Sequence, residues 1–356
     1  MKIFVSTGEV SGDLHLSYIV KNLLEIDGTV EFYGVAGEHS RKAGVNIIQD
    51  INELAIMGFT EAIKKYRFLK KKAYEYLEFI EKEKIEKVIL VDYGGFNLKF
   101  LELLKDKMPE VEVFYYIPPK LWIWGEKRIE KLKRADHIMV IFPWEVDFYK
   151  KHNVDAVYYG NPFSEKYIPL ENRGENVLLL PGSRKQEIKS LFPIMLEIVK
   201  RNPGEKFLLK LSNKKHLEWI DEKLEDIKNL TVSFELDLEG AVKKSKIAIA
   251  ASGTVTLELA LLDIPTVVIY KTNFINYFIA KHILKVGLVS LPNLTLNEEI
   301  FPELLQERCN VLEIEKAMKD ILKNEKEIHK KLDLARKKLS GENITKKYAN
   351  FLLKGI

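Results

Sequence analysis

The sequence predicts an α/β protein made of two doubly wound domains that face a central cleft. Short apolar runs alternate with amphipathic helical patterns along the chain, which is typical of parallel sheets with right-handed crossovers. Each half also begins with a strand, a glycine-containing turn and a helix, in IFVSTGEVSGDLH and in VLLLPGSRKQEI. We therefore expect the functional groups at the carboxyl ends of the strands.

The length of 356 residues also favours two domains of ordinary size. Periodicity is lost over residues 161–174, where Pro, Asn and Gly gather. We place an N-terminal domain at residues 1–165 and a C-terminal domain at residues 166–334. A charged helix is expected over residues 325–353, and it could pack on either domain. We place its last part, residues 335–356, with the N-terminal domain.

Eleven short β-branched or aliphatic runs are expected to form strands. In the first half they are residues 2–6, 30–35, 87–91, 111–117, 137–142 and 154–159. In the second half they are residues 176–180, 206–211, 230–234, 246–250 and 266–270.

Composition excludes several classes of protein. A formal charge of +4 is too small for wholesale nucleic-acid binding, and the single cysteine, Cys309, excludes a disulfide framework and a cysteine-rich metal site. The first residues lack the pattern of a signal peptide, and no apolar run reaches about 18 residues. We therefore expect a cytoplasmic protein.

The first turn, TGEVSGD at residues 7–13, is neither GxGxxG nor a P-loop, so ordinary dinucleotide or ATP binding is not supported. It places Glu9, Ser11, Gly12 and Asp13 at the carboxyl end of a strand. Acids among small residues suit sugar hydroxyls better than phosphates. The alternative is a plain turn before a helix with an acidic first turn.

The segment of residues 62–77, AIKKYRFLKKKAYEYL, carries six basic residues and one acid. Its apolar stripe, at helical spacing, is expected to face the core. On the opposite side, Phe68 is expected among four lysines, which are Lys64, Lys65, Lys71 and Lys72. One interpretation is that this face binds an anionic membrane surface, by insertion of Phe68 and by attraction of the lysines to the lipid charges. The other is a solvated lysine face with one stray aromatic residue.

Asp92 follows the strand at residues 87–91 and opens the sequence DYGGFN. An acid at the carboxyl end of a sheet is well placed to act as general base on an acceptor hydroxyl. An N-cap role explains Asp92 almost as well. Asn97 either orients Asp92 or acts as a cap itself.

Two turns of the second domain are suited to anions. Arg184 follows a strand and Gly182, and arginine binds phosphates through two parallel hydrogen bonds. Ser252, Gly253 and Thr254 join a buried strand to a helix N-terminus, where free N–H groups attract a phosphate. Glu258, one turn later, suits sugar hydroxyls. The alternative for this junction is an ordinary capped helix.

No metal or cofactor is expected. The sequence contains no HExxH, no closely spaced His/Cys set and no convincing DxD. The acids of residues 235–239 stand between a strand and a helix, where they suit capping. We expect Arg184 and helix termini to stabilise a diphosphate without metal.

Taken together, these residues resemble the lipid-A-disaccharide synthases, which are glycosyltransferases of the GT-B type with two Rossmann-like domains. The resemblance rests on seven segments in the family's order, TGEVSGDLH, YGVAGEHSRKAG, LAIMGFTEAI, LLPGSRKQEI, ASGTVTLELALLDIPTVVIYK, VSLPNL and PELLQE. It implies transfer of 2,3-diacylglucosamine from UDP to 2,3-diacylglucosamine 1-phosphate, giving UDP and the β(1→6) disaccharide of lipid A.

The resemblance also implies partners and a location. It implies a protein peripherally associated with the inner face of the cytoplasmic membrane, whose anionic surface the Phe68 face would contact. The expected partners are the UDP-diacylglucosamine donor and the acylated glucosamine 1-phosphate acceptor, with no nucleic acid, and a homodimer is possible.

The resemblance assigns roles residue by residue. Asp92 matches the first Asp of the family's D-x-P-D-F-N and is the general-base candidate. The Glu9–Asp13 turn is expected to face the sugars, and the residues expected to bind the acceptor are Glu9, Ser11, Gly12, Asp13 and Asn97. The residues expected on the UDP side are Arg184, Ser252, Gly253, Thr254, Glu258, Asn293, Glu303 and Gln306.

The sequence also departs from the family pattern on the acceptor side. Gly94 and Gly95 replace the Pro and the second Asp after Asp92. Pro118, Pro119 and Lys120 replace the usual Ser-Pro-Ser, and Asn161 replaces a common His.

We expect an inverting, metal-independent transfer in which Asp92 deprotonates the acceptor 6-hydroxyl. Two alternatives use the same UDP-facing turns, another UDP-sugar GT-B transferase and a UDP-sugar epimerase. A non-catalytic binder of UDP or of membrane surfaces is the alternative of a different class.

Overall fold

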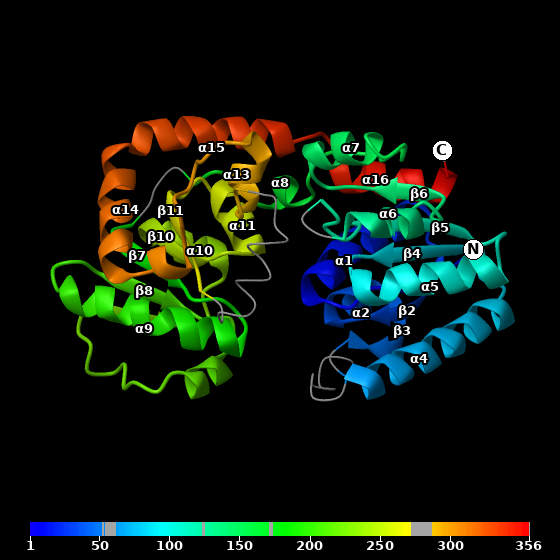
Figure 1. The fold of residues 1–356 in the computed structure, drawn as a ribbon, viewed down its shortest axis with the longest axis horizontal. Coiled ribbons are helices and arrows are strands. Elements are labelled where there is room, and N and C mark those ends of the chain that lie inside the picture. The colour runs from blue at the N-terminus through cyan, green and yellow to red at the C-terminus, as the bar shows by residue number, and fades with distance from the viewer. Residues whose placement is uncertain (52, 54–61, 123–124, 171–173, 272–286, 356) are drawn as a thin grey trace. The chain divides into compact units, whose positions relative to one another are not determined.

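The computed structural model describes residues 1–51, 53, 62–122, 125–170, 174–271 and 287–355, with the backbone alone for residues 62–66. The chain divides into two compact units, one of Met1–Pro162 with Gly341–Ile356 and one of Phe163–Ser340. Each unit is built on a six-stranded parallel sheet flanked by helices (Figure 1). The predicted fold class, two doubly wound α/β domains, is confirmed.

The first unit has the strand order β3-β2-β1-β4-β5-β6. Its strands are β1 (Lys2–Ser6), β2 (Glu31–Ala36), β3 (Val45–Asp50), β4 (Lys87–Val91), β5 (Glu112–Tyr116) and β6 (His137–Met139). Its helices are α1 (Val10–Ile26), α2 (Glu38–Ala43), α4 (Ala62–Lys82), α5 (Gly94–Lys107), α6 (Ile129–Leu132), α7 (Pro143–Lys150) and α16 (Ile344–Lys354). The order reverses between β1 and β4, and ligands of such sheets bind at the carboxyl ends beside this switch point.

Aromatic packing holds α4 and α5 against this sheet. The ring centroid of Phe4 on β1 lies 5.8 Å from that of Tyr76 on α4 and 5.9 Å from that of Phe100 on α5. All three side chains are almost fully buried. These contacts pack β1, α4 and α5 together, and the turn after β1 and the start of α5 belong to the same packed unit.

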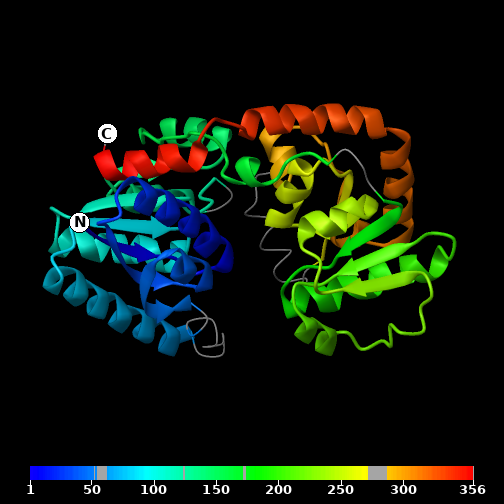
Figure 2. The same ribbon diagram turned by 180° about the vertical axis from the view of Figure 1, so that it is seen from behind.

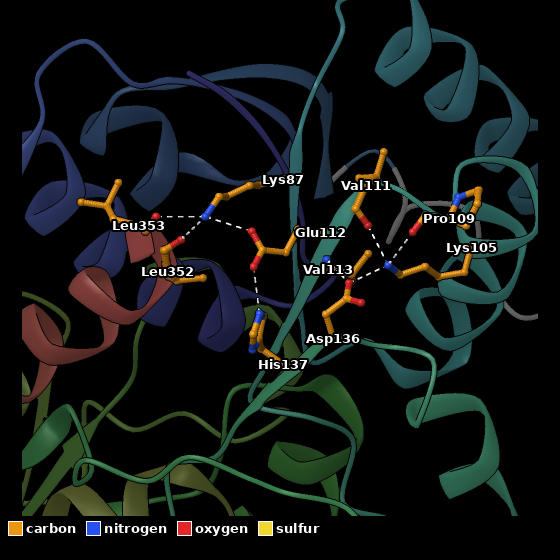
Figure 3. Close-up of polar contacts among 10 residues, drawn as sticks. All are labelled: Lys87, Lys105, Pro109, Val111, Glu112, Val113, Asp136, His137, Leu352 and Leu353. Carbon is orange, nitrogen blue, oxygen red and sulfur yellow. Dashed lines mark hydrogen bonds and ion pairs between the residues drawn. The ribbon is translucent and has the colours of Figure 1, made fainter. Parts of the chain in front are cut away.

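The end of the chain returns to this first unit. Figure 3 shows the Lys87 ammonium donating to the carbonyl oxygens of Leu352, at 2.9 Å, and Leu353, at 3.0 Å. The same ammonium pairs with Glu112 at 3.0 Å, and Glu112 contacts His137 at 2.8 Å. These contacts tie the carboxyl end of α16 to β4, β5 and β6.

The second unit has the strand order β12-β11-β10-β7-β8-β9, with the reversal between β7 and β10. Its strands are β7 (Asn176–Leu180), β8 (Phe207–Lys210), β9 (Leu230–Ser233), β10 (Ser245–Ala251), β11 (Thr266–Tyr270) and β12 (Glu303–Leu305). Its helices are α8 (Phe163–Lys166), α9 (Lys185–Arg201), α10 (Leu238–Lys243), α11 (Thr254–Leu261), α13 (Leu291–Leu296), α14 (Val311–Lys323) and α15 (Glu325–Leu339). Figure 2 shows the same arrangement from behind.

Two expectations about elements are wrong, and two strands were missed. Residues 154–159 form no strand and contribute only an isolated bridge between Val157 and Met139. The single helix expected over residues 325–353 is two helices, α15 and α16, separated at residues 340–343. Strands β3 and β12 were not expected, because β3 contains Asn46 and Gln49 and β12 has three residues.

Candidate active site

The turns after β1 and β4 meet at the switch point of the first unit. β1 pairs with β4 in parallel, so the residues that follow Ser6 and Val91 leave the same edge of the sheet. Gly8 allows this approach, because a Cβ built there would overlap the ring of Tyr93. Glu9 and Asp92 therefore leave the same edge, and the charge of Glu9 acts on Asp92.

Asp92 occupies an unusual backbone position. Its φ of 46° and that of Tyr93, 48°, both fall in the left-handed region, which costs energy for residues other than glycine. The surrounding bonds compensate, since the carbonyl oxygen of Asp92 accepts from the Tyr115 hydroxyl at 2.8 Å and from the Asn97 side chain at 3.1 Å. The turn is thus held in one geometry.

The carboxyl group of Asp92 has a pKa suited to base catalysis. Burial and then the negative charge of Glu9 raise this pKa to about 6, while the ammonium of Lys120 acts in the opposite direction. Near neutral pH the group is therefore ionised but basic enough to accept a proton. Glu9 is exposed and Ser11 half-buried at the same edge.

Asn97 is a positioning residue. Its side chain is fully buried, and its Oδ1 accepts from the Ser6 hydroxyl at 2.7 Å. Its Nδ2 donates to the carbonyl oxygens of Ser6, Val91 and Asp92. The expectation that Asn97 orients Asp92 matches these contacts, whereas direct contact of its amide with a sugar does not.

Asp13 differs from the expectation that it faces the sugars. Its side chain is 1% exposed, and its carboxylate accepts hydrogen bonds from the backbone N–H groups of Gly37, His39 and Ser40. Asp13 thus satisfies the free amides at the start of α2. Gly12 is buried against the Thr7 hydroxyl, so it too supports the turn.

The corresponding edge of the second unit carries the arginine turn. β7 pairs with β10, so the turns at Arg184 and Ser252 leave neighbouring strands. Arg184 is exposed, and its Nη1 lies 3.4 Å from Glu187 Oε1. Glu187 also accepts from the backbone N–H groups of Ser183, at 3.1 Å, and Arg184, at 3.2 Å. A carboxylate therefore already occupies part of this anion-oriented turn.

The Ser252 turn presents the N-terminus of α11. Gly253 is its exposed N-cap residue and makes no side-chain cap, while Ser252 and Thr254 are half-buried. The Thr256 hydroxyl donates back to the Gly253 carbonyl oxygen at 2.8 Å. The first amides of α11 thus lack a capping side chain, as an anion site requires.

Glu258, on the same helix, is half-buried and interacts with two lysines. Burial raises its pKa, and the ammonium groups of Lys166 and Lys210 and a hydrogen bond with Tyr167 act against this shift. Lys210 ends β8, next to β7. The two cations favour the ionised form of Glu258, which accepts hydrogen bonds from hydroxyls.

Asn293 and Glu303 were expected to contact the nucleotide, but their polar atoms are used within the fold. Asn293 is fully buried, donates to Phe301 O and Glu303 Oε1 at 2.8 Å, and accepts from two backbone N–H groups. Glu303 accepts from the N–H groups of Val289 and Ser290. Both residues position the segment before α13. Gln306 is buried, with a left-handed φ of 54°.

The basic segment forms α4, but Phe68 does not lie opposite the core. Phe68 is half-buried and packs against the core cluster of the first unit, and the Lys72 ammonium lies 5.8 Å from its ring centroid. Lys71 is exposed, and Lys72 pairs with Glu75 at 2.9 Å. The side chains of Lys64 and Lys65 lie outside the described residues.

Sequence reasoning missed four residues that shape these sites, Tyr115, Glu187, Lys210 and Glu145, a buried acid that accepts from the Trp122 ring nitrogen at 3.4 Å. Glu187 follows Arg184 by three residues, which is the spacing of a capping box and could have been noticed. The other three gave no signal, because their partners are distant in the sequence.

The residues that the structure describes lack two features. They contain no group of three or more His, Cys, Asp or Glu side chains that could hold a metal ion. No helix among them is both long and apolar enough to cross a membrane.

Solved structures with the same fold include sugar-nucleotide enzymes. The UDP-GlcNAc 2-epimerase of Neisseria meningitidis, bound to UDP-GlcNAc, matches with a TM-score of 0.64 at 12% identity, covering all of both chains. MurG of Acinetobacter baumannii matches with a TM-score of 0.62 at 12% identity, covering 99% of both chains. These likenesses support the GT-B type of fold.

Sequence comparison is more specific. The lipid-A-disaccharide synthase of Geobacter metallireducens is 33% identical over 86% of this chain and 84% of its own length. Lipid-A-disaccharide synthase 1 of Legionella pneumophila is 32% identical over 88% of this chain and 86% of its own. The family model described as lipid-A-disaccharide synthetase matches residues 3–354. The chain therefore belongs to the lipid-A-disaccharide synthetase family of glycosyltransferases.

Proposed function

We propose that this protein transfers 2,3-diacylglucosamine from UDP to 2,3-diacylglucosamine 1-phosphate and releases UDP and lipid A disaccharide 1-phosphate. The observation that carries the mechanism is the position of Asp92, whose half-buried carboxyl group has a pKa of about 6 at the carboxyl edge of β4. Family membership supplies the reaction class.

In the proposed step, the 6-hydroxyl oxygen of the acceptor attacks the anomeric carbon of the donor. Its proton passes to the Asp92 carboxylate as the carbon–oxygen bond forms and the bond to UDP breaks. A single displacement of this kind inverts the anomeric centre. Asn97 and Tyr115 hold the Asp92 backbone during proton transfer, which limits the reorganisation that the reaction requires.

On the donor side, the guanidinium of Arg184 neutralises charge on the departing diphosphate. The uncapped amides at Ser252–Thr254 offer further hydrogen bonds, and Glu258 accepts from sugar hydroxyls of the nucleotide. For the diphosphate to use the amides of Ser183 and Arg184, the Glu187 carboxylate must move away from them. Asn293 and Glu303 contribute indirectly by fixing the segment before α13.

The acylated substrates make a membrane surface the natural site of action. The basic face of α4, with exposed Lys71, is the proposed contact with anionic lipid. Binding to vesicles with and without anionic lipid, compared between the wild type and Lys71→Glu, tests this contact. Equal binding of both proteins would contradict it.

The reaction is tested by incubating the protein with UDP-2,3-diacylglucosamine in detergent and EDTA, with and without the acceptor, and following products by mass spectrometry. Disaccharide that forms only with acceptor supports the proposal and metal independence together. Conversion without acceptor would indicate an epimerase or hydrolase, and UDP binding without turnover would indicate a binding protein.

A further inference from the structure

Lys120 is a cation whose charge acts on the candidate base Asp92. Its side chain is exposed, and it makes no hydrogen bond or ion pair with any residue that the structure describes. Lys105, at the amino end of β5, shows the contrast, since its ammonium binds Asp136 at 2.6 Å and two backbone carbonyl oxygens. The exposed ammonium of Lys120, beside the candidate base, is therefore accessible to a ligand.

The backbone that carries Lys120 is fixed beside Asp92. The N–H of Asp92 donates to the carbonyl oxygen of Ile117 at 3.1 Å, and Ile117 itself has a left-handed φ of 54°. Pro119 packs directly on the start of α5, because a Cβ built on Gly94 would lie 2.5 Å from that of Pro119. The turn of residues 117–121 therefore cannot move away from Asp92 without breaking these contacts.

The surroundings of Lys120 are acidic. Glu9 and Asp92 lie at the same edge, and Glu145 is buried nearby, where it accepts from the Trp122 ring nitrogen at 3.4 Å and from the Phe142 N–H at 3.2 Å. The charge of Lys120 acts on both Asp92 and Glu145. A dianionic phosphate ester entering this edge would be repelled by the carboxylates unless a cation receives it.

We propose that Lys120 binds the phosphate group of the acceptor sugar and thereby helps to present the acceptor hydroxyl to Asp92. This inference rests on the proposed function and adds a residue that recognises the acceptor. Lysine suits this role because its ammonium is a compact charge on a flexible stem, which tolerates a phosphate at varied angles. The alternative source of a phosphate at this position is the diphosphate of the donor.

The test crosses two acceptors with three variants. The acceptors are 2,3-diacylglucosamine 1-phosphate and the same sugar without phosphate, and the variants are Lys120→Met, Lys120→Arg and the control Lys127→Met, an exposed lysine of the same segment. Rates are measured at pH 8, where Asp92 is ionised, and the inhibition constant of UDP is measured for each variant.

Loss of a charge-assisted contact predicts that Lys120→Met lowers kcat/KM for the phosphorylated acceptor by about 10- to 100-fold. The rate with the phosphate-free acceptor and UDP inhibition should change by less than about 2-fold. Lys120→Arg should retain most of the preference, and Lys127→Met should match the wild type. Equal losses with both acceptors would show a structural role, and weaker UDP inhibition would show a donor contact; either result overturns the proposal.

Calorimetric binding of both acceptors in detergent keeps this test independent of turnover. If the wild type transfers no sugar but binds the phosphorylated acceptor through Lys120, the proposed function fails and the Lys120 assignment stands. If transfer occurs but Lys120→Met leaves the affinity for the phosphorylated acceptor unchanged, the Lys120 assignment fails and the function stands.

Discussion

The side-chain nitrogen of Asn97 donates a hydrogen bond of 3.1 Å to the backbone carbonyl oxygen of Asp92. The same amide joins Ser6 at the end of β1 to Val91 at the end of β4. One buried side chain therefore couples the two turns of the acceptor-side edge and holds the candidate base in its left-handed conformation.

Asn97→Ala should destabilise the protein by roughly 2–4 kcal/mol, because it leaves a hydroxyl and several carbonyl oxygens without their buried donor or acceptor. Urea unfolding measures this loss. Asn22→Ala is the matched control, since the Asn22 side chain makes one bond to a carbonyl oxygen of its own helix. A loss for Asn97→Ala no larger than that of the control would contradict the coupling role.

The pH dependence of kcat should follow the ionisation of Asp92. Because the base must be ionised, kcat should fall as the pH drops below about 6 and level off above it. The charge of Glu9 raises the pKa of Asp92, so Glu9→Gln should move the midpoint to lower pH. Glu110→Gln, at an exposed acid outside the site, should leave the midpoint in place. An unchanged midpoint in Glu9→Gln would argue that another group titrates.

Two glycines of the site should respond in opposite ways to alanine. Gly8→Ala would overlap Tyr93 and should cost about 1–3 kcal/mol, as overpacked side chains do. Gly95 has no atom within 4 Å of an added Cβ, so Gly95→Ala in the first turn of α5 should be neutral or stabilising by up to about 1 kcal/mol. Thermal unfolding of the two variants compares them directly. Similar melting temperatures would contradict the close approach of the two turns.

Arg184→Ala should weaken UDP binding by about 10- to 100-fold, because a charge-assisted contact to the diphosphate is lost. The KM for the acceptor should stay the same. Lys185→Ala, at the next exposed residue, should bind UDP like the wild type. Calorimetric titration with UDP measures these affinities, and an unchanged affinity in Arg184→Ala would remove Arg184 from the donor site.

The sequence alone predicts the sheet edges that carry these residues, because strand and turn signals are local. The strands at residues 2–6, 87–91, 176–180 and 266–270 have the predicted bounds. The orientation of side chains is a different problem. Asp13 binds backbone amides 24 to 27 residues away, so its residue type suggests a ligand contact while its geometry is structural.

The same limit applies in the second unit. Asn293 and Glu303 bind each other and the backbone of residues 289–301, which spacing alone does not reveal. Phe68 was misplaced for another reason. A helical wheel assigns it to the polar face, but in the structure Phe68 is partly buried and packs against the core cluster of the first unit.

The most direct test of Asp92 as general base is the comparison of Asp92→Asn with the wild type for both turnover and UDP affinity. Asparagine keeps the size of the side chain but cannot accept the proton, so kcat should fall by about 10²- to 10⁴-fold while UDP affinity stays the same. Turnover within a few-fold of the wild type, or a parallel loss of UDP affinity, would contradict this account of the active site.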